Sequence, residues 1–138
     1  MPHTIHEGGC QCGAIRYQVT GRHLTAALCH CLICRKANAA PAVAWVMYKE
    51  DQVRFLHERP TEYSSSLEGR RGFCPRCGTQ ISFVSGLMPG LIDLTICSLD
   101  TPNDIAPDVH AFESRRLSWL HLADQLPRYP EYPPFETS

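Results

Sequence analysis

The sequence predicts a mainly β fold, built from antiparallel sheets that are held together by zinc and joined by short helical turns. Three observations carry this prediction: short runs in which apolar and polar residues alternate, glycines and prolines that separate those runs, and cysteines that gather in close-set groups. The length of 138 residues favours a single domain spanning residues 1–138.

Five stretches have the pattern of β-strands. In chain order they are residues 15–20, 42–48, 52–55, 80–83 and 92–96, and the second of them, AVAWVMY, is a continuous apolar run typical of a central strand. A further strand is expected at DVHAF, residues 108–112. RKANAA, residues 35–40, predicts one helical turn before Pro41, and residues 117–126 have weak helical spacing. Four prolines between residues 127 and 134 predict an extended tail over residues 130–138.

The charge balance argues against a nucleic-acid or anionic-membrane partner. Thirteen Lys and Arg face fourteen Asp and Glu, and adjacent basic residues occur only as three isolated pairs rather than as a stripe. No apolar stretch is long enough for a transmembrane helix, and the first ten residues lack the apolar centre of a signal peptide. We therefore expect a soluble, cytoplasmic protein.

Eight cysteines are the most informative feature of the sequence. Seven form three groups (Cys10 and Cys12; Cys29, Cys31 and Cys34; Cys74 and Cys77), and Cys97 stands alone. In the reducing compartment expected here, close-set thiols are more often metal ligands than disulfides. Zinc fits best, because tight C-x-x-C turns suit tetrahedral thiolate ligation and the spacings of iron–sulfur proteins are not matched.

Seven grouped thiols divide into a set of four and a set of three. The two pairs, Cys10/Cys12 and Cys74/Cys77, would complete one closed structural zinc site, and the trio Cys29, Cys31 and Cys34 would leave one coordination position open on a second, catalytic zinc. A partition in which Cys97 or His30 closes the trio remains an alternative. An open site with three thiolates is a soft one, which suits a substrate thiol better than a hydroxide.

Residues near the cysteines have both a functional and a structural interpretation. Arg35 and Lys36 follow the trio, where they could lower thiolate pKa values or hold a substrate carboxylate, and Arg71 could also face this site. His30 lies between two expected ligands, and its side chain should point away from the metal. We expect His110 to pack or pair with a neighbour, Cys97 to be a small buried residue, and Trp45 and Trp119 to belong to the core.

Several motifs together resemble one known family. GGCQCGAIRY, CHCLICRKANAA, RRGFCPRCGTQISF, LTICSLD and the late PDVHAF…W…LPRY run are similar to the glutathione-dependent formaldehyde-activating enzyme family, which includes the centromere protein V domain. The resemblance covers about residues 8–129 and implies a β-tent fold. It implies a structural zinc on Cys10, Cys12, Cys74 and Cys77, and a catalytic zinc on Cys29, Cys31 and Cys34. This chain departs from the family pattern at Ala39, where a glycine is usual and where alanine could stiffen the wall beside the trio.

The resemblance implies a carbon–sulfur lyase that binds two zinc ions per chain. Glutathione or a related small thiol would bind at the trio and add to formaldehyde or another aldehyde, and Arg35 is our candidate for a further catalytic residue. The alternative is a binding module in which both zinc ions are structural and the surface recognises a protein partner. Replacement of one trio cysteine separates the two, because it should unfold only the binding module.

Overall fold

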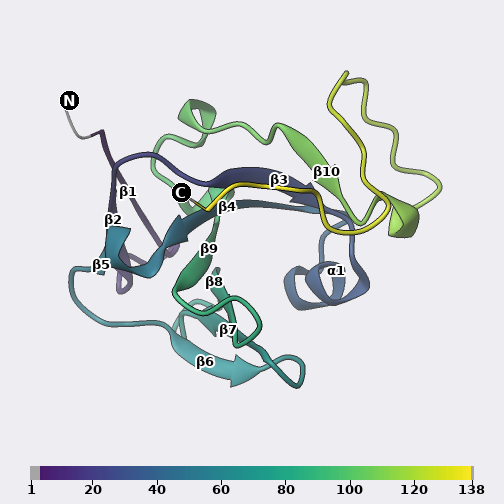
Figure 1. Cartoon of the computed structure of the whole chain (residues 1–138). Coiled ribbons are helices and arrows are strands. Elements are labelled where there is room, and N and C mark those ends of the chain that lie inside the picture. The colour runs from purple at the N-terminus through teal and green to yellow at the C-terminus, as the bar shows by residue number, and fades with distance from the viewer. Residues whose placement is uncertain (1–3, 138) are drawn as a thin grey trace.

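Two β-sheets form the fold in the computed structural model, which describes residues 4–137 (Figure 1). The smaller sheet has the order β1–β2–β5 and consists of β1 (Ile5–Gly9), β2 (Arg16–Thr20) and β5 (Val53–Phe55). The larger sheet has the order β10–β3–β4–β9–β8–β7–β6. Its strands are β3 (Thr25–Cys29), β4 (Val43–Lys49), β6 (Thr61–Ser64), β7 (Gly69–Phe73), β8 (Gln80–Ser85), β9 (Leu91–Thr95) and β10 (Val109–Ala111). The mainly β prediction is confirmed.

Strand pairing in residues 4–137 is antiparallel except at one edge of the larger sheet. There β10 runs parallel to β3, with Val109–Ala111 beside Ala27–Cys29. The five stretches with strand patterns appear as β2, β4, β5, β8 and β9, and the strand expected at residues 108–112 appears as β10. Strands β1, β3, β6 and β7 were not predicted. In β1, β6 and β7, glycines or exposed polar residues interrupt the alternation of apolar and polar residues, and the sequence of β3, TAALC, does not alternate at all.

Strand β4 separates two packed regions, as its continuous apolar run implies. On one face Val46 and Tyr48 are fully buried in the main core, which β2, β8 and β9 complete. On the other face Val43 and Trp45 pack with Cys29, Cys34 and Ala111 in a smaller cluster. This second cluster forms one wall of the site described below.

Helical structure is limited. Helix α1 (Leu32–Asn38) follows β3, so the expected helical turn begins three residues earlier than predicted. Short 3-10 turns occur at Glu50–Gln52, Ile96–Ser98, Pro102–Asp104 and Glu113–Arg115. Within residues 4–137, no helix has the length and apolar character needed to cross a bilayer.

The helical expectation for residues 117–126 is wrong, because the structure has no helix there. Two arginines bind backbone carbonyls of this segment that a helix would need. Arg116 Nη1 donates to the carbonyls of Leu117 and Leu120 at 3.1 and 2.7 Å, and Arg128 Nη2 donates to that of Leu122 at 3.1 Å. Side-chain hydrogen bonds from arginines at the two ends of this segment thus override a weak local preference.

Two burial expectations are also wrong. Trp119 lies in this irregular segment and is 64 % exposed, so it does not belong to the core. Cys97 is exposed, because it sits in the 3-10 turn after β9, where Ile96 occupies the inward position. Trp45 is buried as expected.

Candidate functional site

The first cysteine group joins two hairpins that lie far apart in the sequence. Cys10 and Cys12 lie in the turn after β1, and Cys74 and Cys77 lie in the turn after β7. Their four sulfur atoms lie within 4.8 Å of one another, with the Cys12 sulfur 3.6 Å from that of Cys10 and 3.8 Å from that of Cys74. Four converging thiols are the donor set that a tetrahedral zinc ion prefers, so the residues fit such an ion.

The local backbone supports this convergence. Gly13 and Gly78 follow the two pairs with φ angles of 85° and 81°, which a side chain would strain. The Ile15 N–H donates to the Cys10 sulfur at 3.2 Å, and the Thr79 hydroxyl lies 3.2 Å from the Cys77 sulfur. The Thr79 hydrogen bond is the main cause that lowers the pKa of Cys77 to about 5. These hydrogen bonds stabilise negative charge on the sulfur atoms of Cys10 and Cys77.

The trio lies where β3 meets α1. Cys29 ends β3, Cys31 is the N-cap of α1 and accepts a hydrogen bond from the Cys34 N–H at 3.3 Å, and Cys34 is buried in the first turn. The three sulfur atoms lie within 4.8 Å of one another. Interactions with the side chains of Cys29 and Cys34 lower the pKa of Cys31, and interactions with those of Cys31 and Cys34 raise the pKa of Cys29. Ionisation of the Cys31 thiol thus disfavours ionisation of Cys29 and Cys34. A divalent cation would let all three thiols ionise.

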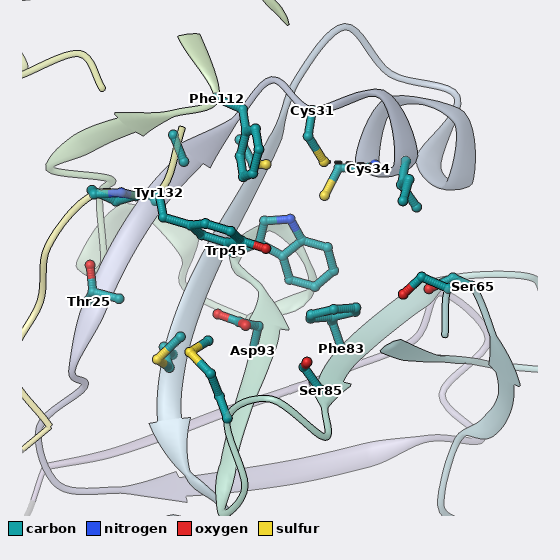
Figure 2. A pocket seen from close by; sticks show the side chains of 18 of the residues that line it. Thr25, Cys31, Cys34, Trp45, Ser65, Phe83, Ser85, Asp93, Phe112 and Tyr132 are labelled. Atoms are coloured by element: carbon teal, nitrogen blue, oxygen red, sulfur yellow. Dashed lines mark hydrogen bonds between the residues drawn. The ribbon is translucent and has the colours of Figure 1, made fainter. Parts of the chain in front are cut away.

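The trio is not closed by a fourth protein ligand within residues 4–137. Neither the His30 imidazole nor the Cys97 sulfur belongs to the group formed by the three trio sulfur atoms. The alternative partition, in which either of them closes the trio, therefore finds no support. The trio instead faces a cavity of about 610 Å³ (Figure 2). An open coordination position and an adjoining cavity are the features of a catalytic rather than a structural metal site.

His30 points away from the trio, as expected. Its Nε2 lies 2.9 Å from Nδ1 of His110, and Nε2 of His110 lies 3.0 Å from the Asp124 carboxylate. Both rings are fully buried. We assign the His110 Nε2 proton to the bond with Asp124, which leaves Nδ1 to accept from His30. This chain of hydrogen bonds fixes the peptide between Cys29 and Cys31 against β10.

The floor of the cavity is a row of side chains from neighbouring strands. Cross-strand pairing places Arg71 beside Phe83, Phe83 beside Asp93, Asp93 beside Met47, and Met47 beside Thr25. All five line the cavity, so they project from one face of the larger sheet. Trp45, Phe112 and Tyr132 complete the walls, and Figure 2 shows Trp45 between Cys34 and Phe83 and Phe112 beside Cys31.

Arg71 is the buried charge nearest the trio. Its side chain is 4 % exposed, and its Nη2 lies 3.6 Å from the Cys34 sulfur. The guanidinium carbon lies over the rings of Phe83 and Trp45, at 4.9 and 5.8 Å from the centroids. Its Nε and Nη1 have no hydrogen-bond partner within the described residues. Two unpaired buried donors are costly unless a ligand accepts from them.

Asp93 is the second charged residue of the floor. Burial raises the pKa of its carboxyl to about 7, and the positive charge of Arg71 offsets part of that effect. Arg71 was a candidate site residue from the sequence, whereas Asp93 was not. The only local signal is an acidic residue at the centre of the apolar strand LIDLT.

Arg35 and Ala39 lie outside the cavity lining. Arg35 is in α1 and its Nε is buried without a partner, but the arginines that line the cavity are Arg71 and Arg115. The catalytic role of Arg35 stays a prediction. Ala39 is the C-cap of α1 with φ 49° and ψ 46°, so its effect is on the helix end rather than on the cavity wall.

The fold and these sites define a small β protein with two cysteine groups that can hold metal ions, one of them open to an apolar cavity. The chain belongs to the family described as glutathione-dependent formaldehyde-activating enzyme, whose family model matches residues 5–115.

Two individual proteins are similar to this chain. A Halomonas elongata protein named "Putative glutathione-dependent formaldehyde-activating enzyme" is 26 % identical over 125 residues, which cover 84 % of this chain and 80 % of that protein. A crystal structure of a Rhodobacter sphaeroides protein superposes with a TM-score of 0.58 over 71 % of this chain and 93 % of that one. At 22 % identity, the second likeness concerns the fold alone.

Proposed function

We propose that this chain is a zinc-dependent carbon–sulfur lyase that joins a small thiol to an aldehyde at the trio Cys29, Cys31 and Cys34. A second zinc ion, on Cys10, Cys12, Cys74 and Cys77, would be structural. The observation that carries the proposal is the juxtaposition of three converging thiols with a cavity that holds a buried, unpaired arginine. Glutathione and formaldehyde are the substrates suggested by the family and by the name of the Halomonas relative.

The metal and the side chains would divide the chemistry between them. A zinc ion held by the trio supplies a position at which a substrate thiol loses its proton near neutral pH. The sulfur lone pair then forms the C–S bond with the aldehyde carbon, and the C=O π electrons move to the oxygen. That oxygen takes up one proton, so thiol plus aldehyde gives a hemithioacetal with no net change in protons or electrons.

Two residues of the chain would assist this addition. The free Nε and Nη1 donors of Arg71 would hold the oxygen as negative charge develops on it, since they need no reorganisation in the buried site. Asp93, with its pKa near 7, would accept the thiol proton and return it to the oxygen. The apolar walls would exclude water, which otherwise hydrates the aldehyde.

Native mass spectrometry of the purified protein, before and after glutathione is added, tests the metal part of the proposal. We expect two zinc ions per chain and a glutathione adduct, which the Cys31→Ser variant should lose together with one zinc. A formaldehyde exchange experiment by NMR should then show faster hemithioacetal formation than in buffer. Two zinc ions that both ignore glutathione would contradict the proposal.

The role of Arg71 has a matched control in its neighbour. Arg71→Met should lower kcat/KM for hemithioacetal formation by about 10- to 1,000-fold, because it removes donors from the developing charge. Arg70→Met should leave it unchanged, since Arg70 is exposed on the opposite face of β7. Equal rates for the two variants would exclude Arg71 from the chemistry.

A further inference from the structure

We infer that the aldehyde carries an apolar substituent of about the size of a phenyl or short alkyl group. This assignment rests on the proposed thiol addition and names the substrate class of that same site.

The size and chemistry of the cavity are the first argument. About 610 Å³ is far more than formaldehyde requires, and ligand sites of 300–1,000 Å³ bind molecules of metabolite size. Phe83, Met47, Trp45 and Met88 line it with aromatic and thioether groups. Such walls gain by excluding water from an apolar ligand.

The position of the charges is the second argument. Arg71 and Asp93 lie in the floor on either side of Phe83, because the register pairs Arg71 with Phe83 and Phe83 with Asp93. Arg71 also lies beside the Cys34 sulfur. An aldehyde whose oxygen accepts from Arg71 therefore has its carbon near the trio, and its substituent has Phe83 and Met47 as its neighbours.

Exposed apolar residues around the mouth of the cavity are the third argument. Leu32, Ile33, Leu87 and Tyr132 are 42–76 % exposed, and all four line the cavity. These are half of the large apolar side chains that are exposed within residues 4–137. Single exposed apolar residues are ordinary, but four of them lining one cavity favour the entry of apolar molecules.

Binding of an unreactive analogue tests the assignment separately from catalysis. In zinc-loaded Trp119→Phe protein, Trp45 is the one tryptophan left, and its fluorescence reports on the cavity. The probes are 3-phenylpropanamide and acetamide, which share a carbonyl but differ in the apolar group. We expect 3-phenylpropanamide to bind about 100-fold more tightly, as burial of a phenyl group allows. Equal affinities would overturn the inference.

Two variants locate the binding. Met88→Asp places a charge at the half-buried edge of the cavity and should weaken 3-phenylpropanamide binding about 10-fold or more. Leu67→Asp is the control, because Leu67 is 98 % exposed and does not line the cavity. The inference fails if both variants bind the probe as the parent does.

Kinetics separate this inference from the proposed function. With glutathione as the thiol, we expect a higher kcat/KM for 3-phenylpropanal than for formaldehyde. Rapid reaction of formaldehyde together with no binding of the phenyl probe would overturn the inference and leave the proposed function standing. Tight probe binding without acceleration of thiol addition for either aldehyde would overturn both.

Discussion

Asp93 should make the stability of the protein depend on pH. The unfolded carboxyl ionises near its ordinary pKa of 3.8, whereas burial raises the folded value to about 7. The folded state therefore binds more protons between these values, so this contribution to stability is full below pH 4 and is lost as the pH rises to 7. Besides Arg71, the charged and titratable neighbours in the cavity are Tyr132, Arg115 and the trio, and the trio is held constant by zinc saturation.

The Asp93→Asn variant tests this dependence. In zinc-saturated protein at pH 8 it should be more stable than the parent by on the order of 2–4 kcal/mol, and the difference should be smaller by about 1 kcal/mol at pH 6. Urea unfolding at several pH values measures it. Asp100→Asn is the control, because its exposed carboxylate is bound by Arg16, which lowers its pKa, so this variant should not gain stability at pH 8. A constant gain from pH 6 to pH 8 would contradict this pH dependence.

Ala39 holds a backbone conformation that alanine disfavours. It caps α1 with φ 49°, in the left-handed region, and its N–H donates to the Arg35 carbonyl. Ala39→Gly should therefore stabilise the folded protein by about 0.5–1 kcal/mol, a rise of a few degrees in Tm. Ala37→Gly, inside the same helix, should instead destabilise it by about 1 kcal/mol. Thermal unfolding that shows the same sign for both would refute the assignment of strain.

At the scale of elements, the two cysteine groups should have different roles in folding. Cys10, Cys12, Cys74 and Cys77 connect the β1–β2 and β7–β8 hairpins, whereas the trio belongs to one continuous segment. Cys77→Ser should thus abolish cooperative unfolding, because metal affinity at a closed site is folding energy. Cys31→Ser should keep the fold with a Tm loss of about 10 °C or less. Circular dichroism and zinc analysis of both variants measure this difference, and equal unfolding of the two would contradict it.

Elements differ in how well the sequence predicts them, for physical reasons. Strand β4 was predicted because a run of seven apolar residues, 42–48, is typical of a buried central strand. The cysteine groups were recognised because the spacing of metal ligands is a local pattern. Strand β7, GRRGF, has no apolar alternation, and its place depends on pairing with β6 and β8. The parallel pairing of β10 with β3 likewise joins strands that lie about 80 residues apart in the sequence, and no local pattern encodes it.

The candidate site was predictable only where it is local. The trio lies within six residues, so its convergence could be anticipated from sequence. Asp93 enters the site because cross-strand register places it between Phe83 and Met47 on the cavity face. A shift of one residue in that register would move it to the opposite face.

At the scale of the whole molecule, the C-terminal segment lies against β10, β3 and β4, at one end of the larger sheet. Figure 1 shows the C-terminal segment running back across β3 and β4. Backbone hydrogen bonds fix its first part, with His110 N–H donating to Pro127 and Phe112 N–H donating to Glu131. Beyond these bonds, the ring of Tyr132 packs edge-on against that of Phe112, with 4.7 Å between the ring centroids. Tyr132 and Phe135 both line the cavity. The segment thus has an anchored part and a part that serves as a wall.

Removal of residues 132–138 should separate these two roles. Because the hydrogen bonds up to Glu131 remain, we expect the truncated protein to unfold cooperatively, with two zinc ions and a Tm within about 10 °C of the full chain. Because Tyr132 and Phe135 contribute apolar surface to the cavity, binding of 3-phenylpropanamide should weaken about 10-fold, whereas acetamide binding should not change. Calorimetry and Trp45 fluorescence measure the two quantities on one sample. Unchanged affinity for the phenyl probe would mean that this segment does not shape the substrate site, and loss of zinc would mean that it supports the fold.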